Sequence, residues 1–453
     1  MRVKANYYSY KTMRMPLLLA GIFLAVNSLQ AQTYTAPPVG FTTTACLANS
    51  DTLVSLPFSR PPDFVGSIAS VSGGTLTISG ATGWQNNQFV YGTALTAGGT
   101  QHNTYYALVG THAVALAGTV SLTAGSNAVT GIGTTFTTAI SAGDGLMLSD
   151  SSGNYIAYYI VSSVTDNTDL VLTGNARTTL SGQTASMSKS TKEGHAYLVT
   201  ANSTSSGTST VTLDTNGEDI SPIVTGTLVS LVPYWTLATV FPPSDLGVSY
   251  IGTQSVRSFG TQILMPYYQG VGINISAYPI YFYSNTNSQW QMEGGSTNAG
   301  DTILLPDGYI TIRNGATATS LTSMGAVSLQ RLAVPLIAGS TPTSSQDNFI
   351  SISRPLPVAL RDLNLIASNA FTPSTSISNI KDQLFLYDNT ATGINKTPPP
   401  NSDYIYIGGI WQHLGGTLGV DAGGDTIPAG AAILIRKAGS NGSTVFWTNP
   451  PTY

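Results

Sequence analysis

Short segments rich in Val, Ile, Thr and Tyr alternate along the chain with clusters of Gly, Asn, Asp and Ser. The segments recur at roughly the 8 to 12 residue spacing that is typical of all-β domains. Within many of them apolar and polar positions alternate, as they do on a strand that buries one face. The pattern therefore predicts an all-β protein.

Three pairs of these segments predict β-hairpins. The pairs join residues 68–71 to 75–78, 159–164 to 168–172, and 197–201 to 210–213. Gly, Asn or Asp lies in each connection, where a tight turn requires a positive φ. Three such hairpins indicate repeated β-modules.

The C-terminal half contains an internal duplication, residues 279–315 and 402–438. Both copies contain a Tyr-x-Tyr strand, a Trp, a Gly-Gly pair, an Asp-Thr pair, a Pro-x-Gly turn and an Ile-Arg pair. Spacings differ by a few residues, as expected where loops vary and strands do not. Two shorter repeats occur elsewhere in the chain: the sequence of Thr52–Leu56 is repeated at Thr227–Leu231, and that of Ser59-Arg60-Pro61 at 353–355.

Residues 115–190 are predicted to be an inserted module, because 103–107 and 197–200 would join directly without them. The module carries Gly-Thr-Val at 118–120 and Gly-x-Gly-Thr-x-Phe at 131–136. These patterns resemble a small β-module of phage tail proteins and bacterial surface proteins. The resemblance implies a surface decoration or a spacer.

We therefore expect two related β-sandwich or barrel domains, with a third small β-module inserted in the first. The expected first β-domain is discontinuous and covers residues 32–114 and 191–245. The inserted module covers 115–190, and the second β-domain, which contains the duplication, covers 246–453.

The N-terminus has the features of a signal peptide. Arg2, Lys4, Lys11 and Arg14 precede an apolar run from Met15 to Val26, with no acidic residue among them. That run is shorter than the roughly 20 residues a membrane-spanning helix needs. We predict a signal peptide over residues 1–31 and export to the periplasm, the cell surface or the medium. No later apolar stretch is long enough to predict a transmembrane helix.

Composition narrows the possible functions. Lys, Arg, Asp and Glu make up 8% of the 453 residues, against the roughly 25% usual for soluble domains, and the net charge is −4. One cysteine and four histidines argue against a disulfide scaffold and a zinc-cluster protein, and the acidic balance argues against a nucleic-acid partner. Cys46 is expected to be a small buried hydrophobe, with pairing to another chain as the alternative.

Several further motifs run through the chain outside the inserted module. They are Pro38-Val-Gly-Phe41, Leu47-Ala-Asn-Ser50, Val232-Pro-Tyr-Trp235, Gln346-Asp-Asn-Phe349, Leu434-Ile-Arg-Lys437 and Phe446-Trp-Thr-Asn449. With its signal peptide, the chain resembles a paralogous family of uncharacterised secreted proteins, many of them verrucomicrobial. The resemblance implies export and the general architecture, and it implies no mechanism.

Aromatic residues give the first candidate site. Trp290 and Trp411 hold equivalent places in the duplication, next to Tyr283 and Tyr406, and aromatic faces stack on sugar rings. Two equivalent glycan-binding sites are one interpretation. The alternative is that each Trp closes its own small core.

Calcium gives the second candidate site. Asp214, Asn216 and Glu218 offer oxygen ligands at alternating positions, which is the chemistry that calcium prefers. The segment does not complete a 12-residue calcium loop, so an ordinary hairpin loop is the alternative. His112 and His195 flank the inserted module and are expected to be polar residues at a junction, with a metal pair as the alternative. No other cofactor is expected.

Enzyme motifs are missing from the sequence: it has no Gly-x-Ser-x-Gly, His-Glu-x-x-His, phosphate-loop or dinucleotide pattern. We expect a non-enzymatic structural or adhesive protein of the cell surface or extracellular layer, whose partner is a surface glycan or another copy of itself. A carbohydrate-binding protein that uses aromatic platforms is the alternative. A polysaccharide-active enzyme is the third possibility, although no pair of carboxylates stands out for it. Arg60 and Arg354 are expected to pair or pack at domain ends, and Arg313 and Arg436 are expected at strand ends.

Overall fold

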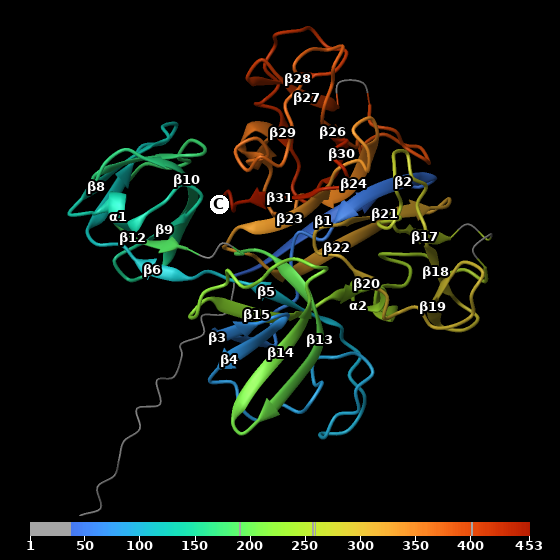
Figure 1. Ribbon diagram of the computed structural model, residues 1–453. Helices are drawn as coiled ribbons and strands as arrows, with labels where there is room; N and C mark the ends of the chain where they lie inside the picture. The colour runs from blue at the N-terminus through green and yellow to red at the C-terminus, as the bar shows by residue number, and fades with distance from the viewer. Residues whose placement is uncertain (1–37, 190–191, 256–257, 259, 400–401) are drawn as a thin grey trace, which may run out of the picture. The chain divides into compact units, whose positions relative to one another are not determined.

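Strands dominate the structure, as Figure 1 shows. The computed structural model describes residues 38–189, 192–255, 258, 260–399 and 402–453. The helices within these ranges are single turns, so the predicted all-β fold is confirmed. The predicted signal peptide, residues 1–31, lies outside the described residues.

The three predicted hairpins are confirmed, and each joins two antiparallel neighbours. They are β3 (Phe64–Ser72) with β4 (Thr75–Ser79), β10 (Tyr155–Val164) with β11 (Asp169–Leu172), and β13 (Ala196–Ser205) with β14 (Thr208–Asp214). The turn between β13 and β14 consists of Ser206 and Gly207, both with positive φ. Two successive positive φ values match the right-handed twist of the strands that they join.

A first group of strands, here called repeat A, comes from residues 39–55 and 235–326. Its central antiparallel sheet has the order β19-β18-β17-β21-β2, and the pairs β1–β22 and β16–β20 flank it. The elements are β1 (Val39–Cys46), β2 (Ser50–Ser55), β16 (Trp235–Thr236), α2 (Leu237–Val240), the 3-10 helix η1 (Pro243–Asp245), β17 (Thr261–Leu264), β18 (Ile280–Ser284), β19 (Gln289–Met292), β20 (Ile303–Leu304), β21 (Tyr309–Asn314) and β22 (Thr319–Ala326).

A second group, repeat B, comes from residues 332–449. Its central sheet has the order β28-β27-β26-β30-β24, with the pairs β23–β31 and β25–β29 beside it. The elements are β23 (Leu332–Ile337), β24 (Ser345–Ser351), β25 (Val358–Ala359), the 3-10 helix η3 (Leu360–Leu363), β26 (Gln383–Leu386), β27 (Asp403–Ile407), β28 (Ile410–His413), β29 (Thr426–Ile427), β30 (Ala432–Ala438) and β31 (Thr444–Asn449).

The two repeats correspond strand for strand. Each strand of repeat A has a counterpart in repeat B with the same partners: β2 corresponds to β24, β17 to β26, β18 to β27 and β21 to β30. The duplication therefore extends well beyond the segments 279–315 and 402–438 in which the sequence shows it. In Figure 1 the blue β2 runs beside the much later β21, with which it pairs over six residues.

A closed six-stranded barrel lies in the chain between β2 and β16. Its strand order is β13-β14-β4-β3-β15-β5, and β5 closes the ring by pairing with β13. The strands not yet defined are β5 (Tyr105–Val109) and β15 (Leu228–Pro233). The strands on either side of residues 115–190, β5 and β13, are therefore neighbours in the barrel, and the insertion of that module stays a prediction.

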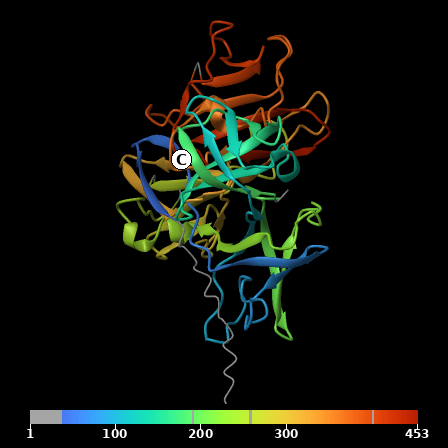
Figure 2. The ribbon, with the colours of Figure 1, turned by 90° about the vertical axis from the view of Figure 1, so that its left-hand side faces the viewer.

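The inserted module lies in the chain between β5 and β13. Its strands, in cyan and green, face the viewer in Figure 2. The long β12 pairs with β7 through its first half and with β9 through its second half, so the sheet closes on itself. The remaining elements are β6 (Ala113–Ala115), β7 (Thr119–Leu122), β8 (Ala128–Ile132), α1 (Phe136–Ala139), β9 (Gly145–Ser149) and β12 (Leu180–Ser188).

Strand pairing groups the N-terminal strands differently from the expected first β-domain of residues 32–114 and 191–245. β1, β2 and β16 pair with repeat A and not with the barrel. The two segments of similar sequence, Thr52–Leu56 and Thr227–Leu231, likewise belong to strands of two different sheets, β2 and β15. A short Thr-Leu-Val-Ser-Leu segment suits any well-buried strand, so it carries no information about which sheet it enters.

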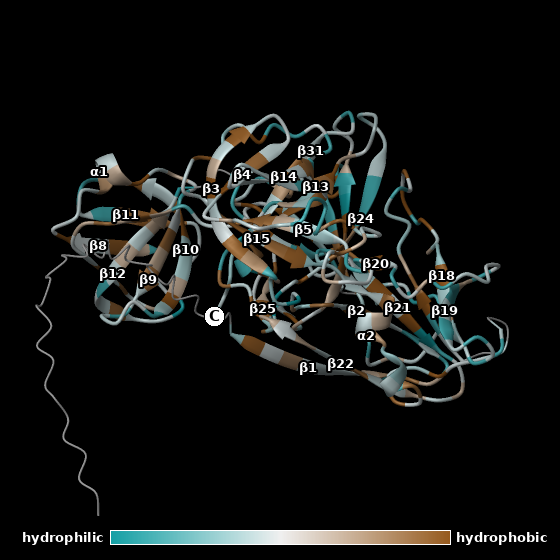
Figure 3. Ribbon diagram, turned by 90° about the horizontal axis from the view of Figure 1, so that it is seen from below, coloured by the Kyte–Doolittle hydropathy of each residue, from teal (hydrophilic) through white to brown (hydrophobic). Residues whose placement is uncertain are grey.

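Each of the four parts has its own apolar core. Figure 3 shows strongly apolar colour on strands such as β15. The largest buried side chains include Trp290 in repeat A, Trp447 in repeat B, and Tyr158 and Phe136 in the inserted module. Trp290 and Trp411 belong to the separate cores of repeats A and B.

A reciprocal pair of polar contacts, here called the two clasps, joins repeat A to repeat B. In the first, Arg313 of repeat A binds Asp51 through Nε at 2.6 Å, and Asn395 of repeat B donates its backbone N–H to the same carboxylate at 2.6 Å. The Arg313 guanidinium also donates to Asn395 Oδ1 at 2.7 Å. A loop of repeat B thus completes an ion pair of repeat A.

The second clasp reverses the roles of the repeats. Arg436 of repeat B binds Asp347 at 2.7 Å, and Asn274 of repeat A donates its backbone N–H to Asp347 at 2.7 Å. Arg436 also donates to Asn274 Oδ1 at 3.0 Å. Each clasp asparagine follows a Gly-Ile pair and has a positive φ. The contact between the repeats is therefore isologous, like that of a two-fold dimer.

Candidate functional site

The two candidate tryptophans lie in the cores of the repeats. Trp290 is 2% exposed and donates its indole N–H to the Phe241 carbonyl at 3.1 Å. Trp411 is 3% exposed and packs against Phe371, with ring centroids 4.9 Å apart. Neither ring has an open face on which a sugar could stack. The interpretation in which each Trp closes its own core describes these positions.

The three candidate calcium ligands do not converge. Asp214 Oδ1 accepts the backbone N–H of Asn216 at 3.0 Å, which forms a local turn. Glu218 instead contacts His195 Nδ1 at 3.1 Å and the Tyr197 hydroxyl at 3.0 Å. Across the described ranges, no group of three or more His, Cys, Asp or Glu side chains could hold a metal ion.

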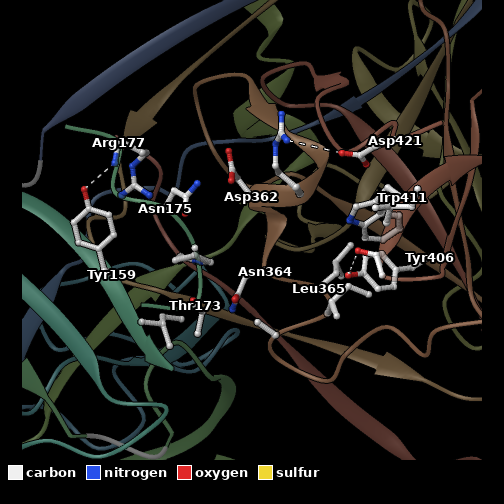
Figure 4. Close-up of a pocket in the computed structure, with 18 of the residues that line it drawn as sticks. Tyr159, Thr173, Asn175, Arg177, Asp362, Asn364, Leu365, Tyr406, Trp411 and Asp421 are labelled. Atoms are coloured by element: carbon white, nitrogen blue, oxygen red, sulfur yellow. Dashed lines mark hydrogen bonds and ion pairs between the residues drawn. The ribbon is translucent and has the colours of Figure 1, made fainter. Parts of the chain in front are cut away.

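A cleft of about 370 Å³ lies between the inserted module and repeat B. Figure 4 shows Tyr159, Asn175 and Arg177 of the module on one side, Tyr406, Trp411 and Asp421 of repeat B on the other, and Asp362 between them. The volume falls within the range of small-ligand sites. The cleft is thus the main candidate site in the described structure.

Arg177 is the central group on the module side of the cleft. Its guanidinium lies 4.7 Å from the centroid of the Tyr159 ring, and its Nη2 donates to the carbonyls of Tyr158 at 3.0 Å and Pro451 at 3.1 Å. The backbone N–H of Arg177 also donates to the Tyr159 hydroxyl at 3.2 Å. These contacts hold a planar cation and an aromatic ring in a fixed arrangement.

The short helix η3 supplies the charged groups on the repeat B side. Leu360 and Leu363 are each 1% exposed and point into the core, so Arg361 and Asp362 between them face outward. The helix ends at Asn364, which has a left-handed backbone at φ 60°. Local amphipathicity and this turn therefore place the two charged residues in the cleft.

Polar contacts hold the remaining groups of repeat B. Arg361 lies 4.0 Å from Asp421 across the cleft edge, and both side chains are substantially exposed. The Asn364 side chain donates to the Thr448 carbonyl at 2.9 Å. Tyr406 is half-buried and donates its hydroxyl to the Gly409 carbonyl at 2.7 Å. The two arginines and two aspartates of the cleft balance in formal charge, so the lining favours neither an anion nor a cation.

Sequence reasoning found only part of this cleft. The duplication singled out Tyr406 and Trp411, which line it. It missed Tyr159, Arg177 and Asp362, because the cleft forms between segments that are distant in sequence and no motif links them. One difference between the repeats could have indicated the cleft: repeat A has Ala238 and Thr239 where repeat B has the charged residues Arg361 and Asp362.

The other residues that the sequence singled out lie in structural positions. Cys46 is 1% exposed, which confirms the expected buried thiol, and burial raises its pKa. His195 packs against Phe446 with ring centroids 4.2 Å apart, and its pKa is lowered by burial. Arg354 is 1% exposed and donates to the Ser328 and Gln330 carbonyls, both at 3.0 Å.

Arg60, which was expected to pair or pack at a domain end like Arg354, has contacts of its own. It donates to Asn103 Oδ1 at 2.8 Å and to the Tyr234 carbonyl at 3.3 Å, whereas Arg354 binds other carbonyls. Arg313 and Arg436 lie near the ends of β21 and β30, as expected, and each pairs with an aspartate of the neighbouring strand.

The described residues contain no helix that is both long and apolar enough to cross a membrane. The resemblances to a secreted family and to a phage-tail module, export and the glycan or self partners stay predictions. Comparison of the chain with protein-family models, with curated proteins and with solved structures finds no match.

Proposed function

We propose that the protein is a non-enzymatic adhesive component of the cell surface or extracellular layer that binds a neutral glycan in the cleft between the inserted module and repeat B. The composition of this cleft carries the proposal. It combines the half-buried ring of Tyr406 with exposed Asn, Asp and Arg side chains. Sugars are recognised by the same combination of ring stacking and planar polar groups, and little apolar surface is needed.

Charge balance favours a neutral sugar over an acidic one. Arg361 is paired with Asp421, and Arg177 contacts the Tyr159 ring and donates hydrogen bonds to two carbonyls. An anionic polysaccharide would need an unpaired cation. Asp362 is exposed at the centre of the cleft, where a carboxylate accepts hydrogen bonds from hydroxyl groups.

Pre-organisation supports a binding role as well. The cleft side chains are held by backbone carbonyls, as Arg177, Asn364 and Tyr406 show. Groups that are already fixed lose less conformational entropy when a ligand binds. The predicted signal peptide, sparse charge and repeated β-modules suit an exported protein that presents such a surface.

The test is a glycan array followed by titration calorimetry of the neutral oligosaccharides that bind. We expect Arg361→Ala and Asp362→Asn each to weaken binding by about 10- to 150-fold, since a hydrogen bond to a charged group contributes about 1.5–3 kcal/mol. Glu293→Gln is the matched control, because Glu293 is exposed in repeat A and away from the cleft residues. Absence of neutral-glycan binding, or equal affinity in all variants, would overturn the proposal.

A further inference from the structure

A second cavity, of about 340 Å³, lies where the barrel, repeat A and repeat B meet. This cavity, here called the central cavity, is distinct from the proposed glycan cleft, because the two share no lining residue. Its walls are mainly apolar and include Leu56, Phe58, Leu108, Leu305, Val334 and Phe446. Small-molecule sites typically have this size and character, with a few polar groups to orient the ligand.

Asp307 is an isolated carboxyl group on the wall of the central cavity. It lies half-buried in the turn between β20 and β21. None of the ion pairs within the described ranges includes it. Burial raises its pKa, and its own backbone amide offsets that rise only in part. A buried carboxylate without a cation is unfavourable unless a partner arrives.

The turn itself does not require an aspartate. Repeat A has Pro306-Asp307-Gly308 at this turn, and repeat B has Pro428-Ala429-Gly430 at the equivalent one. Both turns lead into equivalent strands, β21 and β30. Since alanine forms the same turn in repeat B, the turn in repeat A does not need the carboxyl group of Asp307 in order to form.

Two tyrosines line the same cavity as this carboxyl. The rings of Tyr106 and Tyr234 have centroids 4.7 Å apart, and both residues line the central cavity. Burial raises the pKa of each hydroxyl; the charges of Tyr234 and then Asp307 raise that of Tyr106 further, and the charge of Asp307 raises that of Tyr234 further. Aromatic faces beside a carboxylate form the environment that attracts organic cations.

The other carboxylate of the central cavity is already neutralised. Glu218 pairs with Lys192, with His195 Nδ1 and with the Tyr197 hydroxyl. Burial alone would raise its pKa, but the contacts with these three residues outweigh burial, so its pKa lies below the usual value. Asp307 is therefore the one carboxyl among the described lining residues without a counter-charge.

We propose that the central cavity binds a small organic ammonium ion with an apolar body, whose cationic end lies against Asp307, Tyr106 and Tyr234. The apolar walls match the body of such a ligand, and the surplus carboxylate matches its charge. A metal cation does not fit as well, because calcium takes six to eight oxygen ligands and the walls near Asp307 are mainly apolar.

The probes are benzylammonium and its neutral counterpart of similar size, benzyl alcohol, titrated calorimetrically into the full-length protein at pH 8. We expect benzylammonium to bind at least tenfold more tightly than benzyl alcohol. Asp307→Asn should abolish that preference and leave the affinity for benzyl alcohol unchanged. Glu293→Gln, an exposed acid outside the cavity, should preserve it.

Asp307→Ala provides the second variant, because repeat B already has alanine at this turn and the variant is expected to fold. It too should lose the preference for the ammonium probe. No binding of benzylammonium to the wild type, or an unchanged preference in both Asp307 variants, would overturn the proposal. Neither outcome bears on the glycan cleft, because its titrations use other ligands and other variants.

Discussion

Repeats A and B have the same order of strands and different surfaces. The shared features are the five-stranded sheet, the central Trp next to a Tyr strand, and the Asp–Arg pair of each clasp. The differences lie at turns and short helices. Repeat B has Arg361 and Asp362 where repeat A has Ala238 and Thr239, and repeat A has Asp307 where repeat B has Ala429.

The two repeats can be used to distinguish residues that stabilise the fold from residues that are candidates for binding a ligand. Features present in both repeats, such as the central Trp and the Asp–Arg pair, serve the packing of each sheet or the contact between the repeats. A polar residue present in one repeat only, at a position that its counterpart fills with an apolar or small residue, is free to serve a ligand. Each proposed site includes residues of this second kind: Arg361 and Asp362 in the glycan cleft, and Asp307 in the central cavity.

The largest expected effect comes from the shared tryptophans. Trp290→Ala and Trp411→Ala should each lower the free energy of unfolding by about 3–5 kcal/mol, because each removes a fully packed aromatic side chain. Guanidinium denaturation followed by circular dichroism measures the loss. Phe replacements, which keep most of the ring, should cost less. If Trp411→Ala left stability unchanged while Trp290→Ala did not, the two tryptophans would not have equivalent roles.

The clasps give the next largest effect. Asp51→Ala and Asp347→Ala should each cost about 2–3 kcal/mol, since each removes charged hydrogen bonds to an arginine that keeps some access to water. The two losses should be similar because the contacts are equivalent. Each aspartate variant combined with the alanine variant of its own partner, Arg313→Ala or Arg436→Ala, should lose less stability than the sum of the two single losses. Additive costs would show that the ion pairs contribute nothing as pairs.

Some of this architecture could be predicted from the sequence because it depends on local patterns. Alternating polarity and turn residues predicted the hairpins, such as β13–β14 with its Ser206-Gly207 turn. The Tyr-x-Tyr strand followed by Trp indicated the equivalent hairpins of the two repeats. In each case the residues that form the contact lie within about one hairpin of each other, so the sequence pattern contains the interaction.

Contacts between distant segments could not be predicted in the same way. The pairing of β2 with β21 spans the whole barrel and the inserted module, and alternation alone does not choose a partner for a strand. The glycan cleft likewise joins Arg177 to η3. One such contact did leave a signal: Gly-Ile-Asn occurs at 272–274 and 393–395, the loops that complete the clasps.

A smaller effect should distinguish the repeats by pH. Burial raises the pKa of Asp403 in repeat B to about 6, although Arg436 and the Gln383 side chain oppose the rise, and repeat A has Ile280 at the equivalent position. The folded protein then binds more protons than the unfolded chain between the ordinary pKa and about 6. Stability contributed by this group therefore falls as pH rises through that interval and is not regained above it.

Asp403→Asn removes this proton uptake. Relative to wild type, the variant should gain stability as pH increases from 4 to 6 and keep that gain at pH 7, as measured by denaturation at each pH. Ile280→Val in repeat A should show a difference from wild type that does not change with pH. A constant difference for Asp403→Asn would contradict the raised pKa.

The smallest expected effect concerns the aspartate of the shared Asp-Thr pair. Asp425 lies 3.0 Å from His413 Nε2 and accepts the Tyr404 hydroxyl at 3.1 Å, all within repeat B. Its counterpart Asp301 accepts a hydrogen bond from the hydroxyl of Tyr91 at 2.8 Å and lies 3.7 Å from His102, and both of these residues lie in the connection between the barrel strands β4 and β5. The same residue thus serves an internal contact in one repeat and a contact with the barrel in the other.

Both aspartates are about 40% exposed, so each substitution to Asn should cost about 0.2–1 kcal/mol, the range for exposed charged pairs. The cost of Asp425→Asn should be the larger, because its two partners lie closer and His413 is less exposed than His102. Added salt should reduce both costs, since exposed charges are screened. A cost for Asp301→Asn that exceeded that of Asp425→Asn would mean that the contact with the barrel, and not the internal contact, is the one that stabilises this turn.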